Sequence, residues 1–333
     1  MEQEDVLLRL LSTPQNDYIS GEQLSRALGV SRTAIWKYIT ELRNSGYVVE
    51  AQPRLGYRLV SRPDKLLPAE VRVGLRTRLL GQVVEYHERV DSTNNRGKEL
   101  AFQGAEEGTL VVAEEQTGGR GRRGRAWSSP PGTGIWVSLV LRPNFQPSQA
   151  PLLTLTAAVA AAEAVRDLAG VSAGIKWPND ILAGGRKLAG ILTEMNAELD
   201  VINHVVLGIG INVNTPAFPE DIAAVATSLF LERGGKPVSR VRLLQSFLER
   251  FESWYDRLPQ AAEQLLQRWR ELSVTLGQNV TVTSPAAVLA GVARDVDSEG
   301  ALLLETEDGQ VVRVLSGDVS LRPRQAVHRE EFM

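Results

Sequence analysis

The first sixty residues carry short apolar stripes at helical spacing, separated by turn residues, and this pattern predicts three helices. The first two fall within residues 4–12 and 20–28, with a break at 13–16 between them. Ser31 is placed to cap the third helix, because its side chain can accept a hydrogen bond from the first turn. The inner stripe of this third helix is Ile35, Ile39 and Leu42. Two strands around a turn at 52–56 follow and complete a predicted winged helix.

The third predicted helix has polar groups on its outer side near its N-terminus, where a recognition helix presents side chains to base edges. The candidate DNA-contacting residues on this helix and on the wing are Ser31, Arg32, Thr33, Trp36, Lys37, Arg54 and Arg58. Between Glu22 and Arg62 there are seven basic and three acidic residues, a surplus of four positive charges. We expect a DNA-binding domain over 1–63, although a domain used only for protein contacts would share this fold.

Beyond the predicted winged helix, strand and helix patterns alternate and predict a mixed α/β domain over residues 66–272. Strand patterns at 109–114 and 134–141 enclose a loop, and the apolar stretch 152–168 predicts a core helix. Short strands separated by turn residues then predict a small barrel of five or six strands over 273–325. The expected fold class is therefore a multidomain α+β protein.

The composition excludes several classes of protein and of chemistry. A chain of 333 residues with 43% hydrophobic content can bury large cores, and its net charge of -3 excludes a globally basic nucleic-acid coat. The absence of cysteine excludes disulfides, thiolate nucleophiles and Cys-ligated zinc, and only three histidines argue against a catalytic triad. An acidic N-terminus without a long apolar run is unlike a secretory signal or a membrane span, so we expect a cytoplasmic protein.

The most unusual stretch is residues 118–125, in which four arginines alternate with four glycines. Glycine lets the backbone wrap closely around a ligand, and no Asp or Glu occurs between Gln116 and Ala162 to neutralise the guanidinium groups. We therefore expect an anionic ligand here. The loop contains G-x-G-x-x-G, but the breakers at 128–132 exclude the helix that a dinucleotide fingerprint requires. A solvated basic run that touches nucleic acid is the remaining alternative.

Two apolar runs joined by residues 183–186 predict a hairpin with Asp180 on one arm and Lys187 on the other. A carboxylate that can hold Mg²⁺ beside an ammonium that can neutralise a phosphate oxygen suits phosphoryl chemistry. An isolated pair of this kind also fits a surface salt bridge. The strand 205–214 has glycines that permit close approach, and polar residues at 91–94 start a helix, which alone would be only a cap.

Together these motifs resemble the bifunctional biotin protein ligases that double as repressors of biotin synthesis. The segments that carry the resemblance are 91–94, 119–125 with Trp127, 176–180, 187–191, 208–213, 299–305 and 20–24, in the order and spacing of that family. The resemblance implies a class II synthetase-like central sheet and an SH3-like barrel at the C-terminus. It also implies that the biotin carboxylate attacks the α-phosphate of Mg²⁺-bound ATP to form biotinyl-5′-AMP, from which a lysine of a biotin carboxyl carrier domain takes biotin.

The resemblance assigns residues to each part of this reaction. Expected biotin-binding residues are Ser92, Thr93, Asn94, Gln116, Gly119, Arg120, Gly121, Arg122 and Lys187. Expected ATP-binding or adenylate-binding residues are Arg122, Arg123, Trp127, Asn179, Asp180, Lys187 and Asn212. Lys187, Arg120 and Arg122 are the expected electrostatic catalysts, while Asp180 is either a Mg²⁺ ligand or the group that deprotonates the incoming lysine. The loop 215–229 would cover the adenylate, with Ala226 or Phe230 near the adenine.

The resemblance further implies a repressor that dimerises when biotinyl-5′-AMP is bound and then reaches two operator half-sites with its two winged helices. Two other functions remain open at this stage. One is a ligase for a different carboxylate, such as lipoate, on a similar fold. The other is a ligand-sensing transcription factor without ligase activity, to which the intact Lys187, Asp180 and arginine loop are an objection.

Overall fold

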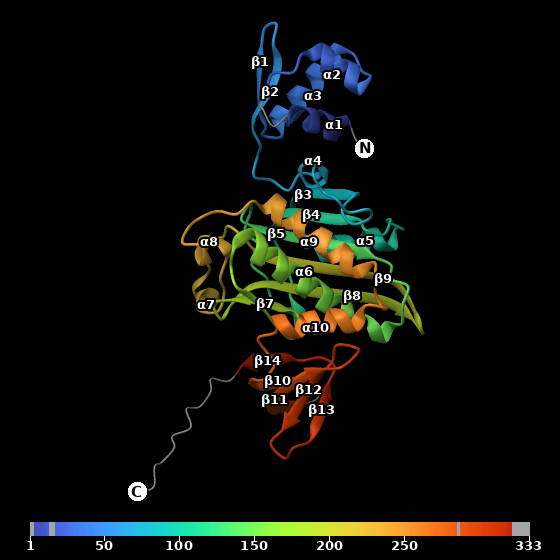
Figure 1. Cartoon of the computed structure of the whole chain (residues 1–333), viewed down its shortest axis with the longest axis vertical. Coiled ribbons are helices and arrows are strands. Elements are labelled where there is room, and N and C mark those ends of the chain that lie inside the picture. Colours follow the sequence, from blue (N-terminus) through green and yellow to red (C-terminus); the bar gives the residue numbers. More distant parts are fainter. Residues whose placement is uncertain (1–2, 13–16, 285–286, 322–333) are drawn as a thin grey trace.

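The computed structural model describes residues 3–12, 17–284 and 287–321 in three parts that follow one another along its long axis (Figure 1). A helical unit with a hairpin lies at one end, a large sheet with helices lies in the middle, and a smaller sheet lies at the other end. The predicted break at 13–16 and the last residues of the predicted C-terminal barrel, 322–325, lie outside the described residues.

The N-terminal unit is a helix-turn-helix followed by a β-hairpin. Its elements are α1 (Gln3–Leu11), α2 (Gly21–Leu28), α3 (Arg32–Asn44), β1 (Val48–Gln52) and β2 (Gly56–Ser61). The side chain of Ser31 accepts a hydrogen bond from the Ala34 amide, so the predicted cap of α3 is confirmed. Ile35, Ile39 and Leu42 are fully buried against α1 and α2, which confirms the predicted inner stripe. The short apolar faces of these helices therefore close one small core.

The central unit is built on a mixed sheet whose order within the described residues is β3-β4-β5-β9-β8-β7-β6. The strands are β3 (Val84–Val90), β4 (Leu110–Gln116), β5 (Gly134–Leu141), β6 (Ala173–Lys176), β7 (Asp180–Ala183), β8 (Arg186–Glu198) and β9 (Val201–Asn212). β3 and β4 are parallel, and the other described neighbours are antiparallel. This arrangement brings the ends of β4 and β9 and the β7–β8 hairpin, all of which carry candidate site residues, to the same region of the sheet.

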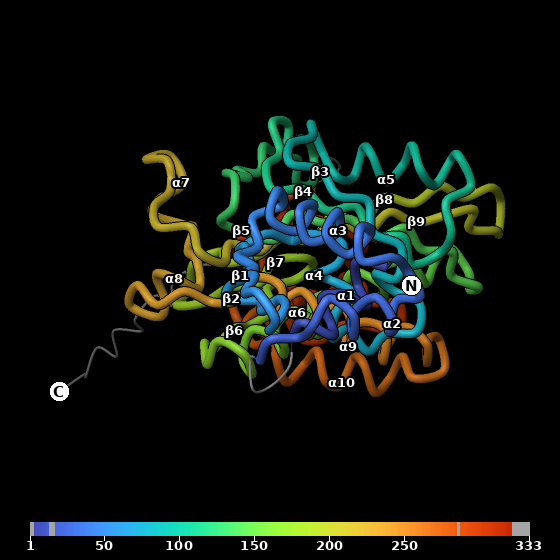
Figure 2. Tube along the Cα trace, turned by 90° about the horizontal axis from the view of Figure 1, so that it is seen from above, coloured from blue at the N-terminus to red at the C-terminus, as the bar shows by residue number. Residues whose placement is uncertain are grey.

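Helices cover both faces of the central sheet. The helices of this unit are α4 (Pro68–Arg72), α5 (Thr93–Phe102), α6 (Pro151–Ala169), α7 (Glu220–Ala223), α8 (Leu229–Glu232), α9 (Arg240–Tyr255) and α10 (Ala262–Leu272), with short 3-10 turns at Arg122–Gly124 and Pro147–Gln149. α6 is the predicted core helix, and α9 and α10 pack beside it on one face. α5 packs on the opposite face, where Ala101 meets Val140 and Val206. Figure 2 shows α5 and α10 on opposite sides of the molecule.

As far as the structure describes it, the C-terminal unit is a five-stranded antiparallel sheet, within the predicted count of five or six strands. Its strands are β10 (Asn279–Thr283), β11 (Val288–Val296), β12 (Leu302–Thr306), β13 (Val311–Val314) and β14 (Asp318–Leu321). They form an antiparallel sheet in the order β13-β12-β11-β10-β14, and in the described part of the chain β13 and β14 do not pair with each other. The prediction of short strands is confirmed, and among the described residues the two outer strands each have one neighbour, so no closed barrel is seen there.

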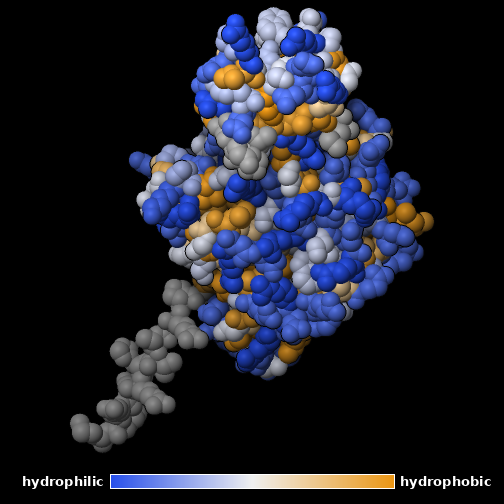
Figure 3. All heavy atoms as spheres, turned by 45° about the horizontal axis from the view of Figure 1, so that its top comes forward, coloured by the Kyte–Doolittle hydropathy of each residue, from blue (hydrophilic) through white to orange (hydrophobic). Residues whose placement is uncertain are grey.

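Hydrophilic side chains predominate over the central unit on the face drawn in Figure 3. None of the helices within the described ranges has the length and apolar character needed to cross a membrane.

Candidate active site

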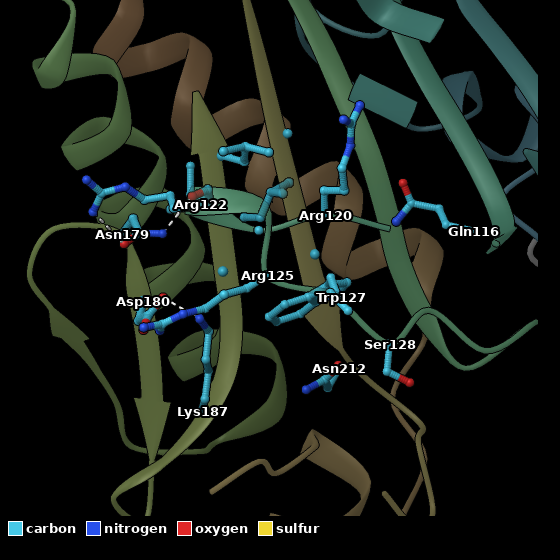
Figure 4. A pocket seen from close by; sticks show the side chains of 18 of the residues that line it. Gln116, Arg120, Arg122, Arg125, Trp127, Ser128, Asn179, Asp180, Lys187 and Asn212 are labelled. Carbon is cyan, nitrogen blue, oxygen red and sulfur yellow. Dashed lines mark hydrogen bonds and ion pairs between the residues drawn. The ribbon is translucent and has the colours of Figure 1, made fainter. Parts of the chain in front are cut away.

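One cavity of the central unit is lined by the arginine loop, the start of α5, the β7–β8 hairpin and the end of β9 (Figure 4). The expected site residues that line it are Ser92, Thr93, Asn94, Gln116, Arg120, Gly121, Arg122, Trp127, Asn179, Asp180, Lys187 and Asn212. Gly119 and Arg123 belong to the same loop but are not among its lining residues. Segments that lie far apart in the sequence, from Ser92 to Asn212, therefore converge on one cavity, as a shared site requires.

The floor of the cavity depends on glycines of β8 and β9. Trp127 lies across these strands, and a Cβ added at Gly210 would come within 2.5 Å of its indole Nε1. A Cβ at Gly190 would come within 3.1 Å of the same ring system. The sequence predicted close approach of a ligand to the glycines of β9, whereas at Gly210 it is the Trp127 side chain that approaches. The indole thus forms an apolar wall of the cavity.

Asp180 and Lys187 face each other across the β7–β8 hairpin, which confirms the predicted hairpin. Lys187 Nζ lies 2.6 Å from Asp180 Oδ1 and 5.3 Å from the centre of the Trp127 ring. Both side chains line the cavity, with 35% of Lys187 and 19% of Asp180 exposed. The pair is therefore part of the pocket wall, where a fixed ammonium can meet an anionic ligand, and not an isolated salt bridge on the outer surface.

The four arginines of the loop fall into two pairs. Arg123 and Arg125 donate to Asp318 of β14, at 3.2 and 2.7 Å. This corrects the expectation that no acid neutralises the loop, because Asp318 lies 193 residues beyond Arg125 and local sequence gives no sign of the contact. Arg120 and Arg122 form no ion pair within the described residues. They leave two positive charges for a ligand.

Arg122 is the more enclosed of these two arginines. Its Nη1 donates to the Gly317 carbonyl oxygen at 3.2 Å and to Asn179 Oδ1 at 3.5 Å. Desolvation by burial lowers the pKa of Arg122 from its ordinary value, partly offset by the nearby charge of Asp318. Burial removes the water that would stabilise the charge of this guanidinium, and its hydrogen bonds go only to neutral groups. A bound anion would supply the missing stabilisation, so Arg122 is placed to bind one.

A hydrogen-bonded network lies at the other end of the cavity, at the start of α5. Gln116 Oε1 accepts from the Thr93 amide at 2.8 Å, and Gln116 Nε2 donates to Ser129 Oγ at 2.9 Å. Ser92 is the N-cap residue of α5, but within the described residues its side chain makes no capping hydrogen bond. The polar residues at 91–94 therefore do not act simply as a helix cap. Three of them, Ser92, Thr93 and Asn94, direct uncharged hydroxyl and amide groups towards the cavity.

Two residues of this network were missed by sequence reasoning. Ser138 Oγ of β5 donates to Asn94 Oδ1 at 2.6 Å, and Asn94 Nδ2 donates to Glu194 Oε2 of β8 at 2.9 Å. Both are single residues inside long strands, so no local motif marks them. Only the pairing of β5 and β8 on either side of β9 brings them to Asn94.

The segment 215–229 closes the cavity from the side of β8. The Lys187 amide donates to the Val225 carbonyl oxygen at 2.7 Å, and the Thr227 amide donates to the Lys187 carbonyl oxygen at 2.9 Å. Asn212 Nδ2 fixes the same segment by donating to the Thr227 carbonyl oxygen at 3.0 Å. Of the two residues considered for an adenine contact, Ala226 lines the cavity and Phe230 does not. Phe218, which the sequence did not single out, also lines it.

The donor set gives no sign of a resident metal. In the ranges that the structure describes, no group of three or more His, Asp or Glu residues is arranged to hold a metal ion. Asp180 supplies one carboxylate to the cavity, and it is already paired with Lys187. Such a site fits Mg²⁺ that is coordinated mainly by water and by the phosphates of a bound nucleotide, because Mg²⁺ commonly takes only one or two protein carboxylates.

The candidate DNA-contacting residues lie on a different unit. Ser31, Arg32, Thr33, Trp36, Lys37 and Arg54 are exposed, and Trp36 is 56% exposed on the outer side of α3. Arg54 lies at the tip of the wing with a φ of 69°, in the left-handed region. Arg58 differs from the others because it donates to Glu50 at 2.6 Å and lies over the Tyr18 ring.

Comparisons with known proteins agree in all three parts of the chain. Residues 3–58 match the HTH domain family, residues 86–212 match the Biotin/lipoate A/B protein ligase family, and residues 275–322 match the Biotin protein ligase C terminal domain family. The chain is 44% identical to the bifunctional ligase/repressor BirA of Bacillus subtilis, over 95% of this chain and 97% of that protein. It is 34% identical to the protein of the same name from Escherichia coli, over 97% and 99%.

Solved structures give a similar result. The biotin protein ligase from Aquifex aeolicus in complex with biotin and ATP has a TM-score of 0.63 and 29% sequence identity to this chain. The similarity covers 72% of this chain and 99% of that one.

Proposed function

Because this chain belongs to the family of bifunctional biotin protein ligases and repressors, we propose that it activates biotin with ATP and transfers it to a lysine of a biotin carboxyl carrier domain. The chain combines a biotin ligase catalytic domain with a helix-turn-helix repressor domain. The observation that supports the proposal most directly is the cavity that Arg120, Arg122 and Lys187 line together. Positive charge there is concentrated around a space whose other end offers uncharged polar groups.

The proposed reaction has two balanced steps. An oxygen of the biotin carboxylate bonds to the α-phosphorus of ATP, the bond from that phosphorus to the bridging oxygen breaks, and pyrophosphate leaves. The acceptor lysine amine then bonds to the acyl carbon of biotinyl-5′-AMP, AMP leaves, and the amine loses a proton. Neither step needs a nucleophile from the protein, which agrees with a chain that has no cysteine. Alignment and charge neutralisation can lower both barriers.

The proposed roles follow the two ends of the cavity. Ser92, Thr93, Asn94 and Gln116 hold the uncharged ring system of biotin. Arg120 and Arg122, with Gly119 before them and Gly121 between them, close over its carboxylate and the phosphates. Lys187 contacts the carboxylate and the α-phosphate. The nucleotide is held by Asn179, Asn212, Trp127, Arg123 and the segment 215–229. Mg²⁺ enters with ATP as part of the substrate, and Asp180 either shares this ion or receives a proton from the acceptor lysine.

Incubation with biotin, Mg-ATP and a carrier domain tests the proposal, with the mass of the carrier domain as the readout. We expect the mass to increase by one biotinyl group on one lysine. A parallel reaction with lipoate addresses the alternative carboxylate, because a lipoyl adduct without a biotinyl adduct contradicts the proposal. Binding of biotin without any adduct would instead favour a ligand-sensing regulator that has no ligase activity.

We also propose that the winged helix binds the operator DNA of biotin genes in the cytoplasm, through the exposed residues of α3 and the wing. Replacing Arg32, Lys37 or Arg54 with alanine is expected to weaken binding to a similar extent for all DNA sequences, since each replacement removes one phosphate contact. Each replacement should also reduce the steepness of the salt slope, the slope of log K against log salt concentration, by about one. Fluorescence anisotropy at several salt concentrations measures both quantities. Arg294→Ala, on the distant C-terminal sheet, is the control and should leave the slope unchanged.

Binding of two half-sites calls for two copies, so we propose that biotinyl-5′-AMP promotes homodimerisation. On gel filtration, the protein alone, with biotin alone or with ATP alone is expected to elute as a monomer. With biotin and Mg-ATP together, the apparent mass should double. A monomer under all four conditions contradicts this proposal and leaves the ligase proposal untouched.

A further inference from the structure

Behind the biotin end of the cavity, a chain of hydrogen bonds leads from Thr93 to the outer surface of β8. Asn94 is its central member, with Oδ1 at 2.6 Å from Ser138 Oγ and Nδ2 at 2.9 Å from Glu194 Oε2. Asn94 Nδ2 also donates to the Leu192 carbonyl oxygen at 3.2 Å. At the outer end, Lys98 Nζ donates to the second oxygen of Glu194 at 2.8 Å. Ser138 is fully buried and Asn94 is 5% exposed, so water does not substitute freely for these partners.

Glu194 determines which group donates and which accepts at each step of this chain of hydrogen bonds. Burial tends to raise the pKa of Glu194, but the hydrogen bonds from Lys98 and Asn94 outweigh burial and hold the pKa below its ordinary value. The group is therefore a carboxylate at neutral pH, which accepts hydrogen bonds and donates none. The Leu192 carbonyl is also only an acceptor. Because both acceptors face the same side of Asn94, its amide nitrogen points to them and its oxygen points to Ser138.

The same order of donors and acceptors continues from Asn94 through Ser138 to Thr93 at the cavity. Ser138 has one hydroxyl proton, and the oxygen of Asn94 at 2.6 Å takes it. Ser138 Oγ also lies 2.8 Å from Thr93 Oγ1, so Thr93 must supply the proton of that second contact. Thr93 Oγ1 is also within donating distance of Gln116 Oε1, at 3.1 Å. Thr93 has one hydroxyl proton, and its contact with Ser138 at 2.8 Å is the shorter of the two, so the proton goes to Ser138 and Gln116 Oε1 accepts from the Thr93 amide at 2.8 Å. Thr93 Oγ1 then presents lone pairs to the cavity.

We infer that Glu194 is a positioning residue for biotin recognition, because its carboxylate sets the direction of the chain and so makes Thr93 an acceptor for an N–H group of the ureido ring. This inference rests on the proposed function, which supplies the ligand. Gly208 makes the arrangement possible, since a Cβ there would come within 1.9 Å of Asn94 Oδ1. A simpler role for Glu194 is a stabilising surface ion pair with Lys98, whose side chains are 34% and 40% exposed.

Three variants separate these two roles. Lys98→Met keeps the acceptor facing Asn94 and removes the ion pair, whereas Glu194→Met removes the acceptor. Exchange of the two residues, Lys98→Glu with Glu194→Lys, keeps opposite charges side by side but turns a donor towards the Asn94 amide. Isothermal titration calorimetry measures the Kd for biotin and, separately, for ATP. The ATP measurement distinguishes a local change at the biotin end from general damage to the cavity.

We expect Lys98→Met to bind biotin within about twofold of the wild-type Kd. Glu194→Met and the exchange variant should raise the biotin Kd by about tenfold, equivalent to about 1.4 kcal/mol. The Kd for ATP should be unchanged in all three. Wild-type biotin affinity in the exchange variant, with weakened binding in Lys98→Met, overturns the inference because only the ion pair would then matter. Wild-type affinity in all three variants overturns it as well.

Absence of biotin binding by the wild-type protein contradicts the proposed function and not the hydrogen-bond chain itself. The ligand-free proteins distinguish the two failures. If the chain is directed as described, the exchange variant should have a lower free energy of unfolding than Lys98→Met, although only the exchange variant retains the ion pair. The reverse order of these two stabilities contradicts the direction assigned to the chain.

Discussion

Replacing Lys187 with alanine is expected to slow adenylate formation by about a hundredfold to a thousandfold, the usual effect of removing one preorganised charge from a transition state. Lys187 Nζ is held by Asp180 at 2.6 Å and lies beside Trp127, in the cavity that Arg120 and Arg122 also line. Negative charge on the biotin carboxylate and the α-phosphate approaches this point during the reaction. Biotin-dependent exchange of pyrophosphate into ATP measures the adenylation step without the acceptor domain.

The neighbouring residue provides a matched control for this prediction. Arg186 precedes Lys187 on β8 but pairs with Glu232 at 2.8 Å, so Arg186→Ala should retain the exchange rate. Lys187→Ala should also retain its fold, because the lost ion pair is one-third exposed on the lysine side and contributes about 1 kcal/mol or less. Exchange within threefold of the wild-type rate in a folded Lys187→Ala protein contradicts the proposed role of this residue.

The parts of the site that the sequence predicts are those built from consecutive residues. The loop 118–125 and the β7–β8 hairpin each carry their own composition and turn signal, so Arg120, Arg122, Asp180 and Lys187 can be found without coordinates. The expectation that these residues share one site came from the family resemblance. The cavity they line then agreed with it.

Contacts across long sequence separations are not predictable in this way. The pairing of Asp318 with Arg125, and of Asn94 with Glu194 and Ser138, depends on which strands become neighbours. The sequence order of the strands does not give that information, because β9 lies between β5 and β8. Closure of the C-terminal strands is not predictable for a similar reason, since a strand count does not determine whether the outer strands meet.

Arg240, at the start of α9, was also invisible to motif reasoning, although it connects the DNA-binding unit to the site. Its side chain is fully buried, and Nη1 donates to Glu114 Oε2 at 2.8 Å and to the Gly134 carbonyl oxygen at 3.2 Å. Its Nη2 donates to the carbonyl oxygen of Asp64, in the linker that follows the winged helix. Glu114 precedes Gln116 by two residues on β4, and Gly134 pairs with Asn212. One guanidinium thus ties the linker to two strands that carry site residues.

Replacing Arg240 with methionine is expected to lower the free energy of unfolding by about 3–5 kcal/mol, because it leaves the Glu114 carboxylate buried without its charged partner. The side chain of Glu114 would keep only the hydrogen bond from the Leu66 amide, which is 2.8 Å long in the structure. Urea unfolding followed by circular dichroism measures the change. Adding Glu114→Gln to Arg240→Met should recover most of the loss, since glutamine is uncharged and still accepts from Leu66. A loss below about 1 kcal/mol in Arg240→Met, or no recovery in the double variant, contradicts an electrostatic origin for this anchor.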